Sequence, residues 1–156
     1  MADNLTVDNV LEKAMEKEIE AQDLYRDLSR KVRDDTARDM FRQLTQVEKK
    51  HENLLKRYRR GELGEGTLEG GHVLDYRIAE HLDQPPITPE MKLDQALLMA
   101  SNRERASHEF YLDLAAAHPS GVVKNLLTDL ASQELEHKHR VEYLYNEVAF
   151  PQTDGG

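Results

Sequence analysis

The chain contains no cysteine and no tryptophan, and it has no long apolar run. Without cysteine it can form neither disulfides nor thiolate-bound zinc, iron–sulfur or rubredoxin-type iron sites. No stretch approaches the roughly 18 apolar residues that span a bilayer, and the N-terminal residues lack a basic-then-apolar signal pattern. These absences predict a soluble, cytoplasmic protein that does not associate with membranes.

The 156 residues are enough for one domain with its own core. Thirty acidic and 21 basic residues give a net charge of −9. The one short basic cluster, residues 56–60, falls at the end of a predicted helix, where cations interact favourably with the helix dipole. Nucleic-acid binding is therefore not expected.

Apolar residues recur at steps of three and four along four long stretches, which is the pattern of amphipathic helices. The predicted helices span residues 7–33, 36–60, 93–117 and about 120–149. Residues 61–71 contain five glycines and predict a flexible connection. Residues 72–82 have the pattern of a short helix whose apolar residues pack on the bundle: Val73, Leu74, Ile78, Ala79 and Leu82. Residues 1–150 are expected to form one domain, followed by a loose tail at 151–156.

Connection lengths predict how the helices are arranged. Short loops join the first helix to the second and the third to the fourth, so each pair should form an antiparallel hairpin. About 30 residues separate the second helix from the third. A connection of that size can return along a helix of about 36 Å, which leaves these two helices parallel. The expected fold is an all-α four-helix bundle of two αα-hairpins with one long crossover.

Two Glu-x-x-His motifs, Glu48/His51 and Glu134/His137, occur 86 residues apart. Residues three apart on a helix share a face, so each pair could hold one ion. A lone motif of this kind is more often a solvated surface pair. Aligning the chain with itself at this offset, however, gives ten identities in 56 positions without a gap. The two repeated segments are residues 5–60 and 91–146.

The same offset selects among competing acids. In the first helix Glu18 aligns with Glu104, whereas the neighbouring glutamates align with residues that are not acidic. The overlapping pair Glu136/His139 is disfavoured, because its counterparts are a lysine and an asparagine. The predicted metal ligands are therefore Glu18, Glu48, His51, Glu104, Glu134 and His137.

Four carboxylates buried together would repel each other unless they are protonated, exposed or bridged by cations. Two divalent ions would neutralise them, and oxygen with imidazole ligands but no sulfur suits iron or manganese. This ligand set is that of the di-iron and di-manganese carboxylate bundles of the ferritin-like kind. Two Fe ions are the expected cofactor, with Mn or Zn as alternative occupants. The structural alternative is a bundle that has lost its metal.

Tyr25 and Tyr111 each follow a ligand glutamate by seven residues, which places them on the same helix face about two turns away. They could hydrogen-bond a ligand carboxylate or tune electron flow, and an ordinary core tyrosine with a satisfied hydroxyl is the alternative. His108, four residues after Glu104, is a candidate seventh ligand. The other histidines are expected at the surface or in loops: His72, His81, His118 and His139.

The chain resembles the rubrerythrins of the ferritin-like superfamily, in particular members without a rubredoxin domain. The resemblance rests on Glu18 and Glu104, each followed by a tyrosine seven residues later, on the two Glu-x-x-His pairs, and on the segment LDYRIAEHLDQPPITPEMKLDQAL. It implies a ferritin-like four-helix bundle, with a short helix in the crossover and a di-iron site whose six ligands act in catalysis through the bound metals.

The resemblance further implies a non-haem di-iron oxidoreductase that reacts with hydrogen peroxide or dioxygen and takes electrons from an external donor; a homodimer is expected. Peroxidase rubrerythrins carry a further ligand glutamate where this chain has Ser107, and they receive electrons from a Cys-ligated iron domain that is absent here. The ligand set is equally similar to a bacterioferritin ferroxidase centre. An enzyme is favoured, with ferroxidase, iron storage or iron delivery as the alternative function.

Overall fold

The computed structural model describes residues 5–86, 88 and 90–149. The helices follow in the order α1 (Val7–Lys31), α2 (Asp35–Arg59), α3 (Tyr76–Glu80), α4 (Leu93–Ala116) and α5 (Val122–Ala149). All four long helices lie within a few residues of the predicted ranges, and no strand occurs in the described segments. The predicted tail at 151–156 lies outside the described residues, so that prediction stays open.

Side-chain caps fix where the first two helices begin. Thr6 accepts a hydrogen bond from the N–H of Asn9 at the start of α1, and Asp34 accepts one from the N–H of Ala37 at the start of α2. After α2, Gly61 has a φ of 72°, a left-handed conformation that glycine adopts without strain. Because α1 ends at Lys31 and Asp34 caps α2, only a very short turn joins the two helices, and they form an antiparallel hairpin.

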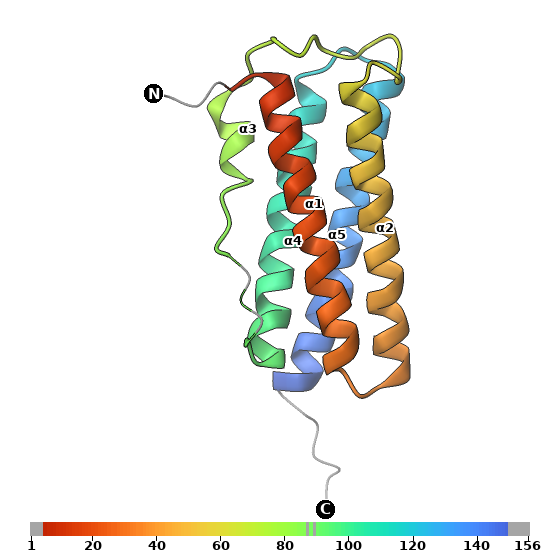
Figure 1. Cartoon of the computed structure of the whole chain (residues 1–156), viewed down its shortest axis with the longest axis vertical. Helices are drawn as coiled ribbons and strands as arrows, with labels where there is room; N and C mark the ends of the chain where they lie inside the picture. The colour runs from red at the N-terminus through yellow and green to blue at the C-terminus, as the bar shows by residue number, and fades with distance from the viewer. Residues whose placement is uncertain (1–4, 87, 89, 150–156) are drawn as a thin grey trace, which may run out of the picture.

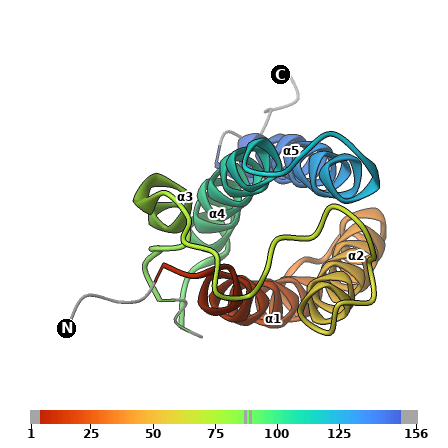
Figure 2. The same cartoon turned by 90° about the horizontal axis from the view of Figure 1, so that it is seen from above.

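The four long helices form one bundle (Figure 1). Seen from its end, the ring order is α1, α2, α5 and α4, with α3 outside the ring beside α4 (Figure 2). The crossover passes over one end of the bundle and returns along its outside, so α2 and α4 run parallel. The predicted fold class, a ferritin-like bundle of two αα-hairpins with one long crossover, is confirmed. None of the described helices is long and apolar enough to cross a membrane.

The short helix of the crossover is shorter than the predicted range of 72–82. Val73 instead forms an isolated antiparallel bridge with Thr6, and the N–H of Leu74 donates to the carbonyl of Leu5 at 2.7 Å. These bonds to the segment before α1 replace the bonds that a helix would have made. The predicted packing of Val73 is wrong, because its side chain is 71% exposed. The predicted burial of Leu74, Ile78 and Leu82 is confirmed.

The core is divided into two apolar clusters. The upper cluster, near the α3 end of the bundle, includes Leu11, Leu55, Ile78, Leu114 and Leu127. The lower cluster includes Leu28, Phe41, Leu97 and Val141. Along each long helix a buried polar stretch separates the residues of one cluster from those of the other. The bundle therefore has a polar layer near its middle, enclosed by apolar packing on both sides.

Candidate metal centre

The polar layer contains all six residues that the sequence predicts as ligands. One glutamate comes from α1 and one from α4, whereas α2 and α5 each contribute a Glu-x-x-His pair. Each of the six is at most 4% exposed. Their positions on the helices put them at one level of the bundle, because each lies between the residues of the two apolar clusters.

The six side chains form two overlapping groups, each able to hold one ion. The first group is Glu18, Glu48, His51 and Glu134, and the second is Glu48, Glu104, Glu134 and His137. Within each group the candidate ligand atoms lie within 4.8 Å of one another. Glu48 and Glu134 belong to both groups, so they are the carboxylates placed to bridge two ions.

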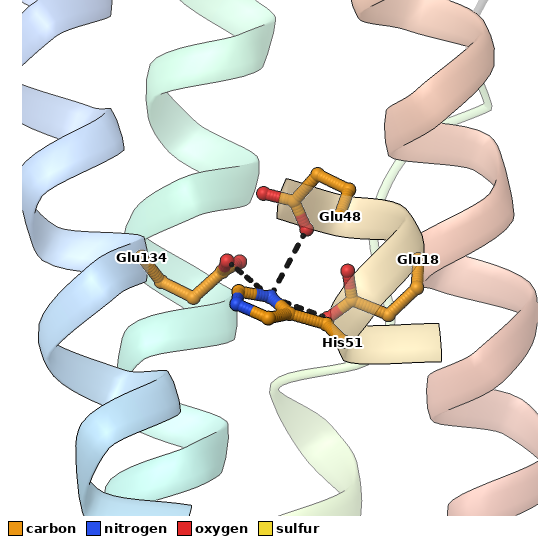
Figure 3. Close-up of side chains that lie close together, drawn as sticks. All are labelled: Glu18, Glu48, His51 and Glu134. Carbon is orange, nitrogen blue, oxygen red and sulfur yellow. Dashed lines mark ion pairs between the residues drawn. The ribbon is translucent and has the colours of Figure 1, made fainter. Parts of the chain in front are cut away.

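His51 faces the first group through its Nδ1 atom (Figure 3). Nδ1 lies 3.0 Å from Glu134 Oε1, 3.4 Å from Glu48 Oε2 and 3.6 Å from Glu18 Oε1. The carboxylates come from α1, α2 and α5, so only the folded bundle assembles them around this nitrogen. The arrangement presents one imidazole nitrogen and three carboxylates to a common point.

His137 repeats this geometry in the second group. Its Nδ1 lies 2.8 Å from Glu48 Oε1 and 3.7 Å from both Glu134 Oε1 and Glu104 Oε1. Each of these three distances has a counterpart around His51, in which both residues are replaced by those 86 positions away. The paired distances agree within about 0.3 Å. The internal repeat of the sequence is therefore expressed as a local two-fold arrangement of the site.

Tyr25 and Tyr111 reach the layer by crossing the bundle. The Tyr25 hydroxyl donates to Glu104 Oε1, and the Tyr111 hydroxyl donates to Glu18 Oε1 at 2.5 Å. Each tyrosine thus contacts the glutamate of the opposite hairpin rather than the one on its own helix. Burial, and then the nearby carboxylates, raise the pKa of both hydroxyls, which keeps them protonated as donors. Of the roles left open by the sequence, the hydrogen bond to a ligand carboxylate is the one observed.

The acids of the layer are not electrostatically equivalent. Burial and the neighbouring carboxylates raise the pKa of Glu48 and of Glu134. Burial also opposes ionisation of Glu18, but hydrogen bonds and the charge of His51 leave its pKa below the usual value. The raised pKa values favour the neutral form of the two shared carboxylates, and a metal ion bound there would have to displace any proton that they hold.

The two histidines of the layer are shifted toward their protonated form. Desolvation alone would lower their pKa values, but the facing carboxylates raise the pKa of both His51 and His137. Because a ligating imidazole must be neutral, cations would release these protons as well. Protons and divalent cations are therefore alternative ways to balance the same buried charge.

Buried polar atoms without hydrogen-bond partners indicate that the layer is a candidate cation site. In the part of the chain that the structure describes, five buried side-chain atoms have no hydrogen-bond partner, and all five belong to the predicted ligands. They are Glu18 Oε2, Glu48 Oε2, His51 Nδ1, Glu104 Oε2 and Glu134 Oε1. Buried polar groups are nearly always paired, and carboxylate oxygen with imidazole nitrogen suits iron or manganese. The residues present therefore fit a pair of divalent metal ions.

A small cavity of about 20 Å³ adjoins the layer between α1, α4 and the crossover. Its wall includes Tyr25, Arg103 and Ser107, together with three of the predicted ligands. The volume is enough for one or two water-sized molecules. Arg103 is held there by an ion pair with Glu20 and a hydrogen bond to the Pro85 carbonyl at 3.0 Å. The cavity is large enough for a small reactant to lie beside the predicted ligands.

His108 does not join the predicted ligands. Its Nδ1 lies 2.7 Å from the carbonyl of Ala131, and it belongs to neither of the two groups. His118 lies in the loop after α4, which is one of the two positions predicted for it, but its side chain is only 3% exposed.

His118 is buried because its ring ties the crossover to the bundle. Its Nδ1–H donates to the Leu114 carbonyl at 2.7 Å, and its Nε2 accepts from the Tyr58 hydroxyl at 2.6 Å. The same hydroxyl accepts from the N–H of Leu68 at 2.9 Å. This chain of bonds joins the ends of α2 and α4 to the glycine-rich connection.

Sequence reasoning missed two polar residues beside the layer. Gln133 Oε1 lies 2.7 Å from His51 Nε2, and Glu52 is a buried acid outside both ligand groups. Burial disfavours the charge of Glu52, but hydrogen bonds from nearby lysines and from Gln22 lower its pKa to about 2. The repeat could not reveal either residue, because the counterparts 86 positions away are Val47 and Lys138.

Comparison with known proteins bears on the fold and the family. The family model described as Rubrerythrin matches residues 1–59, which include Glu18, Glu48 and His51. A solved structure of a hypothetical protein from Pyrococcus furiosus is similar over 95% of this chain and 93% of that chain, with a TM-score of 0.74 and 22% identity. That likeness supports the fold alone. No curated protein matches. The match supports the predicted resemblance to the rubrerythrins over these 59 residues, and the helices form the ferritin-like bundle that the resemblance implies.

Proposed function

We propose that the chain is a non-haem di-iron oxidoreductase that reacts with hydrogen peroxide or dioxygen. One observation carries the proposal: two four-residue ligand groups lie side by side and share Glu48 and Glu134. Iron bound there would supply one-electron redox chemistry by cycling between Fe(II) and Fe(III). An external donor would supply the electrons.

The residues of the chain would have distinct tasks at this centre. Glu48 and Glu134 would bridge the ions, His51 and His137 would each bind one ion through Nδ1, and the remaining acids would each bind one ion. The Tyr111 hydroxyl donates a hydrogen bond to Oε1 of Glu18, so Oε2 is the oxygen of that carboxylate without a partner. The Tyr25 hydroxyl donates to Oε1 of Glu104, and Oε2 of Glu104 is likewise without a partner. The tyrosines would thus orient these two carboxylates toward the ions.

The surroundings of the layer support a small reactant. The adjoining cavity of about 20 Å³ suits a reactant as small as a molecule of two heavy atoms. Apolar clusters close the layer above and below, which limits access by water. Both features are compatible with hydrogen peroxide or dioxygen as the oxidant.

A specific residue supports a second candidate, iron oxidation for storage or delivery. Ser107 lines the cavity where a glutamate would add another ligand, so the set remains four glutamates and two histidines. The two candidates predict different assemblies. A homodimer in solution favours the redox enzyme, whereas a large hollow assembly favours iron storage, and light scattering distinguishes the two.

Rapid mixing tests the proposed reaction. The protein is loaded with two equivalents of Fe(II) without oxygen and mixed with hydrogen peroxide or dissolved dioxygen. We expect oxidation faster than that of free Fe(II) at the same pH, and Glu48→Gln should remove the acceleration. Oxidation no faster than in the protein-free control would overturn the proposal, as would elemental analysis that finds no metal in protein from iron-supplemented cells.

A further inference from the structure

We propose that Gln133 is a positioning residue that makes the two metal positions unequal. The position formed by Glu18, Glu48, His51 and Glu134 would bind a divalent ion more tightly than the position that contains His137. The inference rests on the proposed metal function of the layer, and it concerns the second nitrogen of each histidine.

Gln133 fixes how the His51 ring presents its nitrogens. Nε2 lies 2.7 Å from the amide oxygen Oε1 of Gln133, and an amide oxygen can only accept a hydrogen bond. Nε2 must therefore carry the proton in this contact. With that proton held, Nδ1 keeps its lone pair for an ion among Glu18, Glu48 and Glu134. A partner of this kind sets both the tautomer and the orientation of a ligating histidine.

The two halves of the site have matching contacts around Nδ1 but differ at the contact between Gln133 and His51. The distances around the two Nδ1 atoms match, and the two tyrosine hydrogen bonds are related by the same offset. The residue 86 positions before Gln133, however, is Val47, whose side chain has no polar atom. The side-chain hydrogen bond of His137 is made by Nδ1, to Glu48 Oε1 at 2.8 Å, and no amide stands at the counterpart of Gln133 to accept from its Nε2. No side chain equivalent to Gln133 therefore fixes the tautomer and the ring orientation of His137.

The expected size of the difference follows from this contact. Loss of an outer partner of a ligating histidine typically reduces metal affinity about 10- to 100-fold. Gln133 is itself exposed, so its replacement removes the hydrogen bond without opening the core. The difference between the two positions should be of the same size and should depend on residue 133.

Metal titration tests the inference. Metal-free protein is titrated with Co(II) against a competing chelator, and the cobalt absorption is followed. The wild type should bind two ions in separate steps, and Gln133→Leu should weaken the first step about 10- to 100-fold. Gln133→Glu restores an acceptor and should restore the first step. Val47→Leu, the matched apolar change in the other half, should alter neither step.

The histidine protons give a second readout, independent of affinity and activity. In the zinc-loaded protein, nitrogen-15 NMR should show the Nε2–H of His51 exchanging slowly with water and that of His137 exchanging rapidly. Gln133→Leu should speed the exchange at His51 alone. A merely structural role of Gln133 would change overall stability and leave this difference between the two rings intact.

The outcomes separate this inference from the proposed function. Two ions that bind with equal affinity, unaffected by Gln133→Leu, would overturn the inference and leave the metal function standing. A protein that binds no divalent ion would overturn both. Slow proton exchange at His51 that persists in Gln133→Leu would also overturn the positioning role.

Discussion

The polar layer and the apolar clusters on either side of it are equally buried but differ in how their atoms are satisfied. Leu28 in the lower cluster and Leu114 in the upper cluster are fully buried, and so is Glu48 between them. Burial of the leucines stabilises the fold at about 25 cal/mol per Å² of apolar surface. Burial of Glu48 costs free energy unless a proton or cation balances its charge. Equal burial therefore has opposite energetic consequences in the two regions.

This contrast assigns different tasks to the two regions. The clusters hold the four helices in register, and the register keeps four acids and two imidazoles together. The layer gains its stability from what it binds. Changes in the layer should act mainly on metal binding, whereas changes in the clusters should act mainly on folding.

The largest expected effect comes from Glu48→Gln. Burial and the neighbouring carboxylates raise the pKa of Glu48 and so favour its neutral form in the metal-free protein. An amide of the same size should therefore change the free energy of unfolding by less than about 1.5 kcal/mol. In the wild type, ions at about 100 times their dissociation constants should add about 2.7 kcal/mol per site. The variant should lose this gain at both sites, because Glu48 belongs to both groups.

Denaturant unfolding with and without Mn(II) measures both quantities for this variant. The exposed change Glu136→Gln, on the overlapping motif that the structure leaves outside the layer, serves as the control. If Glu48→Gln still gained stability from two equivalents of Mn(II), the assignment of Glu48 as a shared ligand would be wrong.

Leu28→Ala and Leu114→Ala should show the opposite pattern. These leucines are counterparts in the repeat, each 0% exposed, and a cavity at either site should cost about 2–5 kcal/mol of unfolding free energy. The loss should be the same with and without metal, since neither residue contacts an ion. Unfolding curves combined with a metal count per chain measure this. A stability loss that disappears on metal loading would contradict the separation of tasks.

Tyr25 and Tyr111 lie where the apolar clusters meet the polar layer, so their replacement tests how the two regions are coupled. Tyr25→Phe and Tyr111→Phe each remove a hydrogen bond to a buried carboxylate and should lower the unfolding free energy by about 1.5–3 kcal/mol. The two losses should be similar, because the contacts are related by the two-fold arrangement. Tyr143→Phe on the exposed surface is the control and should leave stability unchanged. Clearly unequal losses for the two core tyrosines would argue against equivalent halves.

The smallest expected effect is a pH dependence outside the layer. Burial lowers the pKa of His118, and the neutral ring accepts the hydrogen bond of Tyr58. Because the folded-state pKa lies below the unfolded value near 6.5, the contribution to stability is complete above about pH 6.5. It is lost as the pH falls toward the folded-state pKa. Thermal unfolding from about pH 8 to about pH 5 should therefore show a steeper decline for the wild type than for His118→Gln. Parallel declines would remove His118 as the cause.

Local sequence patterns predicted the helices and their pairing well. The period of apolar residues defined four long helices, and the loop lengths required two hairpins and one crossover. The crossover itself was predicted less well. The start of the expected short helix instead forms a bridge between Val73 and Thr6, a long-range backbone contact that no local pattern encodes.

The repeat determined which six side chains to consider, because residues at equal steps on related helices must face the same interior. The sequence alone thus defined the set of candidate ligands and the helix face that carries each of them. It could not show how the faces meet across the bundle. That Tyr25 contacts Glu104, that Gln133 supports His51 and that His118 is buried depend on helix packing and side-chain rotamers. Contacts between helices are set by this packing, so only the tertiary structure decided them.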